Sequence, residues 1–204
     1  SNLKRYDAYD RGKSQVYVGE YAAHERNRVN TLNTALAEAA YLTGLERNAD
    51  LVRLASYAPL LAKEGRTQWR PDMIYFDNAR IVRTANYYVQ QLFSRHCGDE
   101  YLPSELTTDV KRFAASCVRD SASGDVIVKL VNASADVVSA EIDLGDLPIA
   151  GKATQWTLSG SSEAHNTFDS PDAVEPSSES VVVGKPIHSE LPPHSLRVIR
   201  CQTH

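Results

Sequence analysis

The stretch that decides the fold is QVYVGEYA at residues 15–22, together with the helical and apolar segments that follow it. Residues 15–19 are a short run of β-branched and aromatic side chains that ends at Glu20. Such a run, bounded by a polar residue, is typical of a buried parallel strand. Glu20 is therefore expected at the end of an inner strand.

A strand–helix–strand unit is predicted from this point. In TLNTALAEAAYLTGL (residues 31–45) the apolar side chains recur at helical spacing, with Asn30 as the expected N-cap and Gly44 near the end. The apolar segment LVRLASYAPLL (residues 51–61) contains Pro59, which suits a second parallel strand that leaves into a loop. Together they form a βαβ unit.

A second helix is expected at residues 84–94 (TANYYVQQLFS), after a loop that contains Trp69, Pro71 and Asn78. Two strands that are each followed by a helix resemble two successive units of a (β/α)₈ barrel, which are far too few to close a barrel. Residues 1–100 are therefore expected to be the C-terminal part of such a barrel.

The sequence changes character near residue 100, which is the best domain boundary available. Residues 101–204 contain short strands separated by Gly, Pro, Asn and Ser clusters, as in an antiparallel, jelly-roll-like β-sandwich. Residues 159–178 are expected to form a long polar loop that His165, Phe168 and Val174 anchor. The fold class is therefore an α+β fragment. The expected strands are residues 111–119, 125–132, 137–144, 153–158, 180–183 and 196–201.

Composition excludes several classes of protein. The 22 basic and 26 acidic residues give a net charge of −4 without a basic stripe, so nucleic acid is not an expected partner. No apolar run approaches the ~20 residues that span a bilayer, so no membrane partner is expected either. Cys97, Cys117 and Cys201 have no zinc-ligand spacing and are interpreted as buried or free thiols.

Several motifs, taken together, resemble the α-L-arabinofuranosidases of glycoside hydrolase family 51. They are VYVGEYA (residues 16–22), ALAEAAYLTGLERNAD, LASYAPLL, a WxPDxIxFDN pattern from Trp69 to Asn78, NYYVQQLFS, HNTFDSPDAVEP and LPPHSLRV. The resemblance covers nearly the whole chain. It implies a parent enzyme with a (β/α)₈ catalytic barrel and a C-terminal β-sandwich, of which this chain supplies the last two barrel units and the sandwich.

The resemblance also implies the chemistry. Glu20 is the expected nucleophile of a retaining glycosidase that releases terminal α-L-arabinofuranosyl groups from arabinan- or arabinoxylan-type glycans, with no metal or organic cofactor. Its acid/base glutamate follows an Asn on an earlier barrel strand and is missing here, so the fragment alone is expected to be inactive. A periplasmic or secreted location is favoured for the parent, although the sequence leaves the compartment open.

Each candidate site residue has a simpler alternative. Glu20 could be a polar residue at the end of an edge strand, and Tyr21, expected beside the nucleophile, could be an ordinary core tyrosine. Trp69 and Asn78 are expected to hold a furanose ring by stacking and hydrogen bonding, but they could instead pack under the loop and cap a turn. His24 is interpreted as a solvated loop histidine.

Asp72 and Asp77 are two further carboxylates near Trp69, and a set of apolar residues is expected in the core. The resemblance places Asp72 and Asp77 in a structural loop rather than in the role of the missing acid. The residues expected in the core are Tyr41, Leu45, Leu54, Tyr57, Leu61, Tyr87, Tyr88, Leu92 and Phe93.

A second hypothesis concerns partners and the sandwich. Part of the surface of residues 15–95 would face the missing barrel units. We expect the isolated chain to hide that surface by forming a homo-oligomer or by rearranging its helices on the sandwich. The sandwich could act as a non-catalytic module that stabilises the barrel or binds polysaccharide. The stabilising role is favoured, because Trp156 is the one Trp in residues 103–204.

Overall fold

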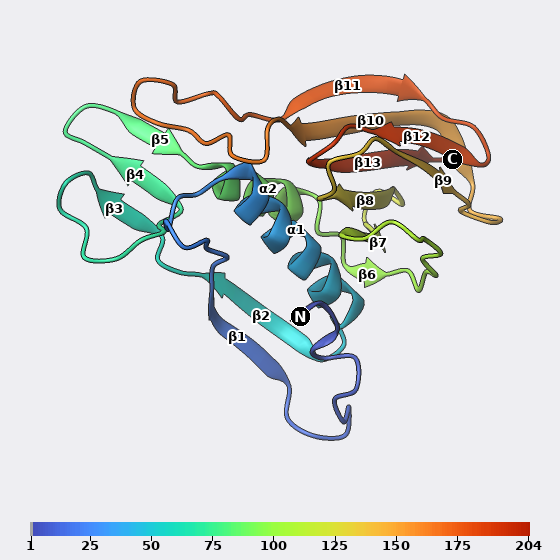
Figure 1. Cartoon of the computed structure of the whole chain (residues 1–204). Coiled ribbons are helices and arrows are strands. Elements are labelled where there is room, and N and C mark those ends of the chain that lie inside the picture. Colours follow the sequence, from blue (N-terminus) through green and yellow to red (C-terminus); the bar gives the residue numbers. More distant parts are fainter. Residues whose placement is uncertain (1) are drawn as a thin grey trace.

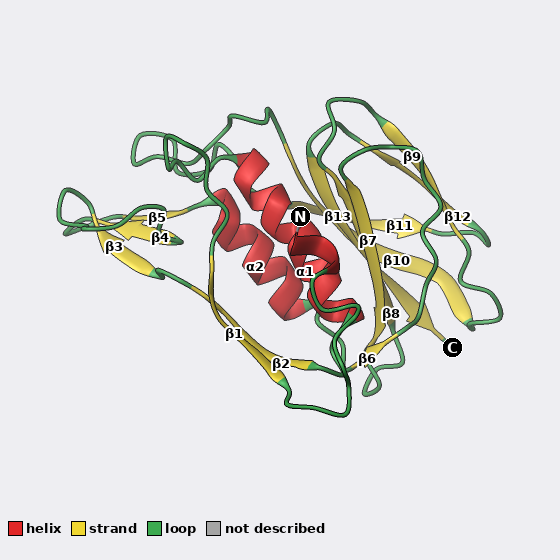
Figure 2. Cartoon of the chain, turned by 60° about the horizontal axis from the view of Figure 1, so that its bottom comes forward, coloured by secondary structure: helices red, strands yellow, loops and turns green. Residues whose placement is uncertain are grey.

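Two helices lie between two sheets in the computed structural model of the chain, which describes residues 2–204 (Figure 1). Figure 2 shows the layers in order: strands β1 and β2, helices α1 and α2, a large sheet, and the pair β9 and β12 on its far side. The elements are η1 (Asn2–Lys4), β1 (Val16–Tyr21), α1 (Leu32–Arg47), β2 (Val52–Tyr57), β3 (Leu61–Lys63), β4 (Ile74–Phe76), β5 (Ile81–Arg83), α2 (Ala85–Arg95), β6 (Glu100–Tyr101), β7 (Phe113–Arg119), β8 (Val126–Asn132), β9 (Val138–Ile142), β10 (Ile149–Ser159), β11 (Ser177–Val182), β12 (Ile187–Leu191) and β13 (Ser195–Thr203).

The predicted βαβ unit is present. Strands β1 and β2 pair in parallel, from Val16 opposite Val52 to Tyr21 opposite Tyr57, and α1 joins them. The predicted N-cap is wrong by one residue. The side chain of Thr31 accepts the N–H of Thr34, whereas Asn30 is buried and donates to Asn86 on α2. Both residue types suit an N-cap, so only tertiary contacts separate them.

A small sheet occupies the region that was expected to be a loop. Strand β4 pairs in parallel with β3 and antiparallel with β5. Each of these strands has three residues, which is too short for an alternating pattern to be recognised in the sequence. Helix α2 follows directly, with Thr84 as its N-cap.

The second half is the predicted antiparallel structure. Its large sheet has the order β11-β10-β13-β8-β7-β6, and the pair β9–β12 is antiparallel. Two strands were not predicted. Strand β6 has two residues. In β12 the exposed His188 and Glu190 alternate with the buried Ile187, Ser189 and Leu191.

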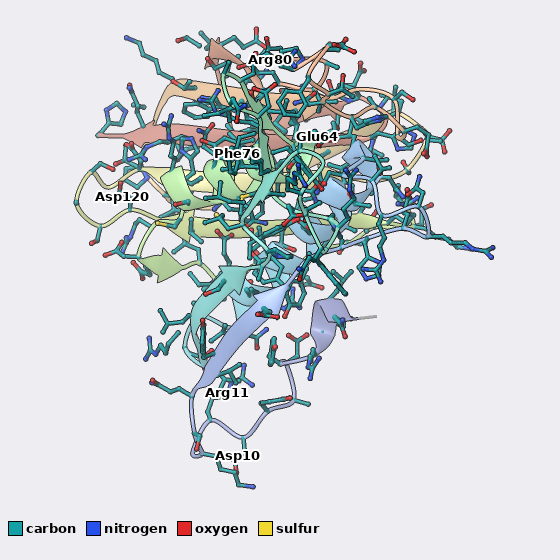
Figure 3. The ribbon with its side chains drawn as sticks, turned by 90° about the vertical axis from the view of Figure 1, so that its left-hand side faces the viewer. Asp10, Arg11, Glu64, Phe76, Arg80 and Asp120 are labelled. Atoms are coloured by element: carbon teal, nitrogen blue, oxygen red, sulfur yellow. The ribbon has the colours of Figure 1, made fainter. Side chains whose placement is uncertain are left out.

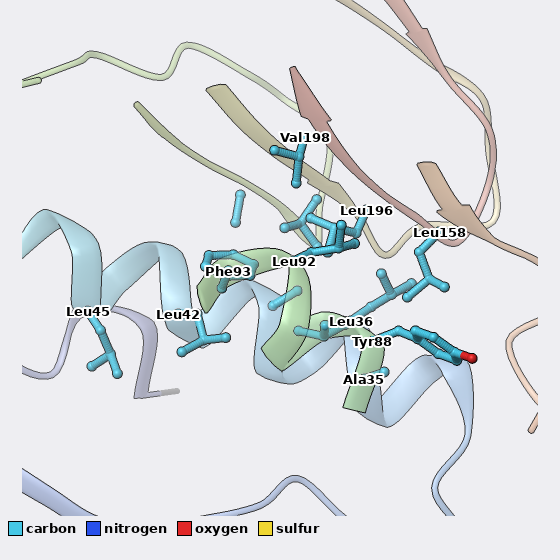
Figure 4. Close-up of a cluster of buried hydrophobic side chains, with 14 of the residues drawn as sticks. Ala35, Leu36, Leu42, Leu45, Tyr88, Leu92, Phe93, Leu158, Leu196 and Val198 are labelled. Atoms are coloured by element: carbon cyan, nitrogen blue, oxygen red, sulfur yellow. The ribbon is translucent and has the colours of Figure 1, made fainter. Parts of the chain in front are cut away.

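The large sheet is covered on both faces. All residues of β8 are buried, and their side chains alternate between two cores. On one face Ile127, Val131, Leu196 and Val198 pack against α1 and α2 (Figure 4). On the other face a second core packs beneath β9 and β12. The helices are therefore part of the hydrophobic core rather than a separate unit. The second core consists of Cys117, Val126, Val128, Leu130, Ile149, Ala153, Ile187, Leu191, Ile199 and Cys201.

A buried ion pair crosses the interface between the helices and the sheet. Lys129 lies on the helix-facing side of β8 and is fully buried, with its Nζ atom 2.6 Å from Oε1 of Glu46 on α1. The hydroxyl of Ser116 on β7 donates to the other carboxylate oxygen at 2.5 Å. Each charge therefore has a partner, which a buried ion requires.

Two of the expected core residues are exposed. Leu54 is 64% exposed and Leu61 is 58% exposed, whereas Leu45, Tyr88, Leu92 and Phe93 are buried as predicted. Leu54 lies opposite Tyr17, which is 60% exposed, so the outer side of the β1–β2 pair carries apolar side chains in contact with solvent. Exposed apolar side chains that lie side by side mark a surface that can pack against a further layer.

The ion pair gives a prediction about stability. Replacing Lys129 by Met should lower the free energy of unfolding by about 3 kcal/mol, because the Glu46 carboxyl loses its buried partner. The double variant Lys129→Met/Glu46→Leu should recover most of that loss, because no unpaired charge remains. Urea unfolding at neutral pH measures both. A loss below about 1 kcal/mol in the single variant would contradict a structural role of the pair.

Candidate active site

Glu20 is the next-to-last residue of β1 and its side chain is exposed. It lines a cavity of about 620 Å³ that extends between β1, α1, the segment around Tyr6 and the start of β7 at Phe113. Tyr21 and Glu38 line the same cavity. A carboxylate at the C-terminal end of a parallel strand, open to a cavity, can reach a bound substrate.

The residues after Glu20 are held by both helices. The Tyr21 hydroxyl donates to Oε1 of Gln90 on α2 at 2.6 Å, and the ring packs edge-on against Tyr41 and Tyr57. The Ala23 N–H donates to Oε1 of Glu38 on α1 at 2.8 Å. The backbone on the C-terminal side of Glu20 therefore has a fixed path.

Glu38 has an unusual electrostatic environment. Burial raises its pKa from an ordinary value near 4.5 to about 8, although polar groups of Ala23, Asn86 and Gln90 act in the opposite direction. Burial also raises the pKa of Tyr21 and Tyr57, and the nearby Glu38 carboxyl adds to both increases. Glu38 is therefore neutral over most of the physiological pH range.

Trp69 and Asn78 are not among the residues that line the cavity at Glu20. Trp69 follows β3, is 52% exposed, and has the Arg28 guanidinium 4.5 Å from its ring centroid. Asn78 is exposed in the turn between β4 and β5. Figure 3 labels Phe76 and Arg80 on this small sheet, which follows the C-terminal end of the β1–β2 pair along the chain. The structure therefore joins Glu20 and Tyr21 at one cavity but does not bring Trp69 or Asn78 to it.

The other polar residues considered in the sequence have local roles. His24 is exposed. Asp77 accepts the backbone N–H groups of Ala79 and Arg80 and forms an ion pair with Arg80, so it caps the β4–β5 turn. Asp72 is buried, accepts from Thr67, and has a pKa raised by burial. These contacts agree with the structural loop that was expected for both aspartates.

Other kinds of site find no support within residues 2–204. No cluster of three His, Cys, Asp or Glu side chains with metal-binding geometry occurs in this range. Neither described helix has the length and apolar character needed to cross a membrane. Cys97 is exposed, while Cys117 and Cys201 are buried thiols whose pKa is raised to about 11 by burial.

Glu38 and Gln90 are the functional candidates that sequence reasoning missed. A signal was present for Glu38, which is three residues after Ala35 and four before Leu42, both of them buried. An acidic side chain on the apolar side of a helix indicates a buried partner or a functional group. Gln90 carries no comparable signal, because a glutamine is common on a partly exposed helix face.

Comparisons with known proteins agree on one family. A family model described as the α-L-arabinofuranosidase C-terminal domain matches residues 9–195. An extracellular exo-α-L-arabinofuranosidase of Streptomyces chartreusis is 44% identical over 163 residues, which is 78% of this chain and 19% of that protein. α-L-Arabinofuranosidase 1 of Arabidopsis thaliana is 30% identical over 96% of this chain and 30% of its own length. The chain thus spans less than a third of these relatives.

Solved structures match the whole arrangement of sheets and helices. An arabinose-bound GH51 α-L-arabinofuranosidase superposes with a TM-score of 0.93 and 33% identity, covering 100% of this chain and 35% of that one. An α-L-arabinofuranosidase of Thermotoga maritima superposes with a TM-score of 0.79 at 19% identity, over 92% of this chain and 43% of that one, and so supports the fold alone. The helices therefore lie on the large sheet as they do in a longer enzyme, rather than in a rearrangement specific to this chain.

The environment of Glu38 predicts how stability depends on pH. Between pH 4.5 and about 8 the unfolded chain releases the Glu38 proton while the folded chain keeps it, so the free energy of unfolding falls as pH rises through this range. The variant Glu38→Gln does not ionise. Its stability relative to the parent chain should therefore rise by a few kcal/mol from pH 5 to pH 8.

Urea unfolding at pH 5, 6.5 and 8 measures this difference. The variant Glu105→Gln, which changes an exposed glutamate, serves as the control and should track the parent chain. A Glu38→Gln curve parallel to that of the parent chain would show that Glu38 is ionised throughout.

Proposed function

The chain belongs to the α-L-arabinofuranosidase C-terminal domain family, and from this membership we propose that it is part of a retaining glycosidase with Glu20 as nucleophile. The whole protein would release terminal α-L-arabinofuranosyl groups from arabinan- or arabinoxylan-type glycans. The observation that carries the proposal is the position of Glu20: its exposed side chain lines a large cavity near the end of a parallel strand. Catalytic residues occupy this position in (β/α)₈ enzymes.

The reaction needs two carboxyl groups about 5 Å apart. The Glu20 carboxylate would attack the anomeric carbon and form a glycosyl ester as the bond to the leaving oxygen breaks, and a second carboxyl would protonate that oxygen. The second group, now ionised, would take a proton from water, which cleaves the ester and frees Glu20 with net retention at the anomeric carbon. These steps are acid–base and nucleophilic chemistry of side chains and of water.

The second carboxyl is proposed to come from another part of the protein. The sequence contains no Asn-Glu pair, the motif that the family's acid/base residue occupies. The β1–β2 pair has exposed apolar side chains such as Tyr17 and Leu54, which suits contact with further barrel strands. We propose that residues 1–100 complete such a barrel, and that the chain alone does not catalyse hydrolysis.

Two residues are proposed to contact the glycan and one to support the nucleophile. The half-exposed Trp69 ring offers a stacking surface, and the exposed Asn78 amide offers hydrogen bonds to hydroxyl groups. Their place outside the Glu20 cavity suits contact with sugar units beyond the one that is cleaved. Tyr21 is proposed to form the wall of the site, because its hydroxyl is already engaged with Gln90.

The sandwich is proposed to stabilise the catalytic part rather than to bind polysaccharide. Trp156 is partly buried, and its ring centroid lies 4.1 Å from that of His96 at the end of α2. This contact leaves Trp156 poorly placed as a sugar-binding platform, for which a free aromatic face is needed. The Streptomyces relative is named extracellular, which supports secretion of the whole protein.

The role of Glu20 is tested in the complete enzyme. Glu20→Ala should lower kcat for an aryl α-L-arabinofuranoside by at least 10⁴-fold, because no other group can form the covalent intermediate. Added azide should partly restore turnover by replacing the missing nucleophile. Turnover within tenfold of the parent enzyme would end the assignment.

The role of Trp69 is tested with an arabino-oligosaccharide. Trp69→Ala should raise KM by roughly fivefold with little change in kcat, because a stacking contact is worth about 1 kcal/mol and is made equally before and during the reaction. Trp156→Ala is the matched control and should lower stability without changing KM. Equal KM values for Trp69→Ala and the parent enzyme would leave Trp69 without a substrate role.

A further inference from the structure

A continuous set of hydrogen bonds surrounds the segment that follows Glu20. The Tyr21 hydroxyl donates to Oε1 of Gln90 at 2.6 Å, and the Gln90 amide donates to Oε2 of Glu38 at 3.3 Å. The other Glu38 oxygen accepts the Ala23 N–H at 2.8 Å. Residues 21–23 are therefore attached at both ends to one carboxyl–amide pair, which α1 and α2 supply together.

Strand pairing adds a third attachment on the opposite side. The Tyr21 carbonyl accepts the N–H of Ala58, the residue that follows β2, at 3.3 Å. The segment after Glu20 is thus held by β2 on one edge and by the two helices through side chains. The backbone of residues 21–23, next to Glu20, therefore has little freedom to move.

A carboxyl at position 38 is costly for folding. Glu38 is 2% exposed, and burial opposes its ionised form. An apolar side chain of similar size would avoid that cost, but it could not accept the Ala23 N–H, which would then lack this partner. The carboxyl supplies two acceptor atoms at fixed positions on a rigid helix.

We propose that Glu38 is a positioning residue for the nucleophile: it fixes the backbone of residues 21–23 and thereby the direction in which the Glu20 side chain leaves β1. This inference rests on the proposed function of Glu20. Glu38 itself does not act on the substrate, since both of its oxygens are engaged by Ala23 and Gln90. A misplacement of about 1 Å in a reacting group can lower the rate by about 100-fold, so a backbone contact at this point has a large effect.

The geometry distinguishes two substitutions. Glu38→Gln keeps an oxygen for the Ala23 N–H, and its amide can donate to Gln90 if the Gln90 side chain turns over. The Tyr21 hydroxyl can accept as well as donate, so the network survives that turn. Glu38→Leu keeps the volume but removes every acceptor. The two variants therefore separate the hydrogen-bonding role from the packing role.

The test compares both variants in the complete enzyme, well below their unfolding temperatures. With an aryl α-L-arabinofuranoside, Glu38→Leu should lower kcat by 30- to 100-fold with KM within threefold, whereas Glu38→Gln should stay within fivefold of the parent. A 2-fluoro arabinofuranosyl compound with a good leaving group, followed by intact-protein mass spectrometry, should label Glu38→Leu correspondingly more slowly, at Glu20. Leu45→Ala, a buried truncation on the same helix, is the stability control and should leave kcat within twofold.

Each outcome bears on one proposal only. A Glu38→Leu enzyme with kcat within threefold of the parent, or no slower than Leu45→Ala, would overturn the positioning role, and so would a Glu38→Gln enzyme as slow as Glu38→Leu. If Glu38→Leu does not fold, Gln90→Leu takes its place, because it breaks the link to Tyr21, and an unchanged kcat there would again overturn the role. Labelling at a residue other than Glu20 would refute the proposed nucleophile instead.

Discussion

Helix α1 has to be buried on two sides at once, and the rest of the structure depends on how its polar groups meet that constraint. One side packs on the large sheet and the other faces strands β1 and β2 (Figure 2). Most of the helix is buried, so a polar side chain on α1 that points into either layer needs a partner there. Glu46 forms an ion pair with Lys129 and accepts a hydrogen bond from Ser116, both on the sheet. Glu38 accepts hydrogen bonds from the Ala23 N–H, just after β1, and from the Gln90 amide on α2.

The two carboxyls meet the same physical problem in different ways. Burial raises the pKa of Glu46 too, and the positive charge and hydrogen bond of the neighbouring Lys129 oppose that increase. Burial raises the pKa of Glu38 to about 8, because no positive charge lies beside it and the neutral hydrogen-bond donors around it lower the pKa only in part. The two acids therefore differ in whether a neighbouring positive charge opposes the effect of burial.

The parts of the fold that follow from local sequence were the ones that could be predicted. Helical spacing in residues 31–45, β-branched runs such as VIVKLVN and the turn residues between them indicate elements without knowledge of their neighbours. Strands β3 to β6 have two or three residues each, and their pairing comes from tertiary contacts. Thr31 is the N-cap, while Asn30 donates to Asn86, a residue far away in the sequence that local spacing does not reveal.

The same distinction applies to the site. The position of Glu20 at the end of a strand could be predicted from one apolar run and the motif around it. The hydrogen bonds that hold the backbone next to Glu20 could not be predicted, because Gln90 and Glu38 come from two different helices and meet only in the folded chain. The expected core positions of Leu54 and Leu61 were wrong for a related reason: an apolar residue shows that burial is favourable but not which layer would cover it.

Helix α1 thus connects the sandwich to the proposed site. Near its C-terminal end Glu46 is bonded to β8, in the middle of the large sheet, and two turns earlier Glu38 is bonded to the backbone just after Glu20. A helix is stiff over this length, because each turn is held by its own backbone hydrogen bonds. A displacement of α1 on the sheet would therefore move the segment next to Glu20, the proposed nucleophile. This gives the sandwich a physical role in the proposed glycosidase that needs no contact with substrate: it sets the position of the helix that holds the segment after Glu20.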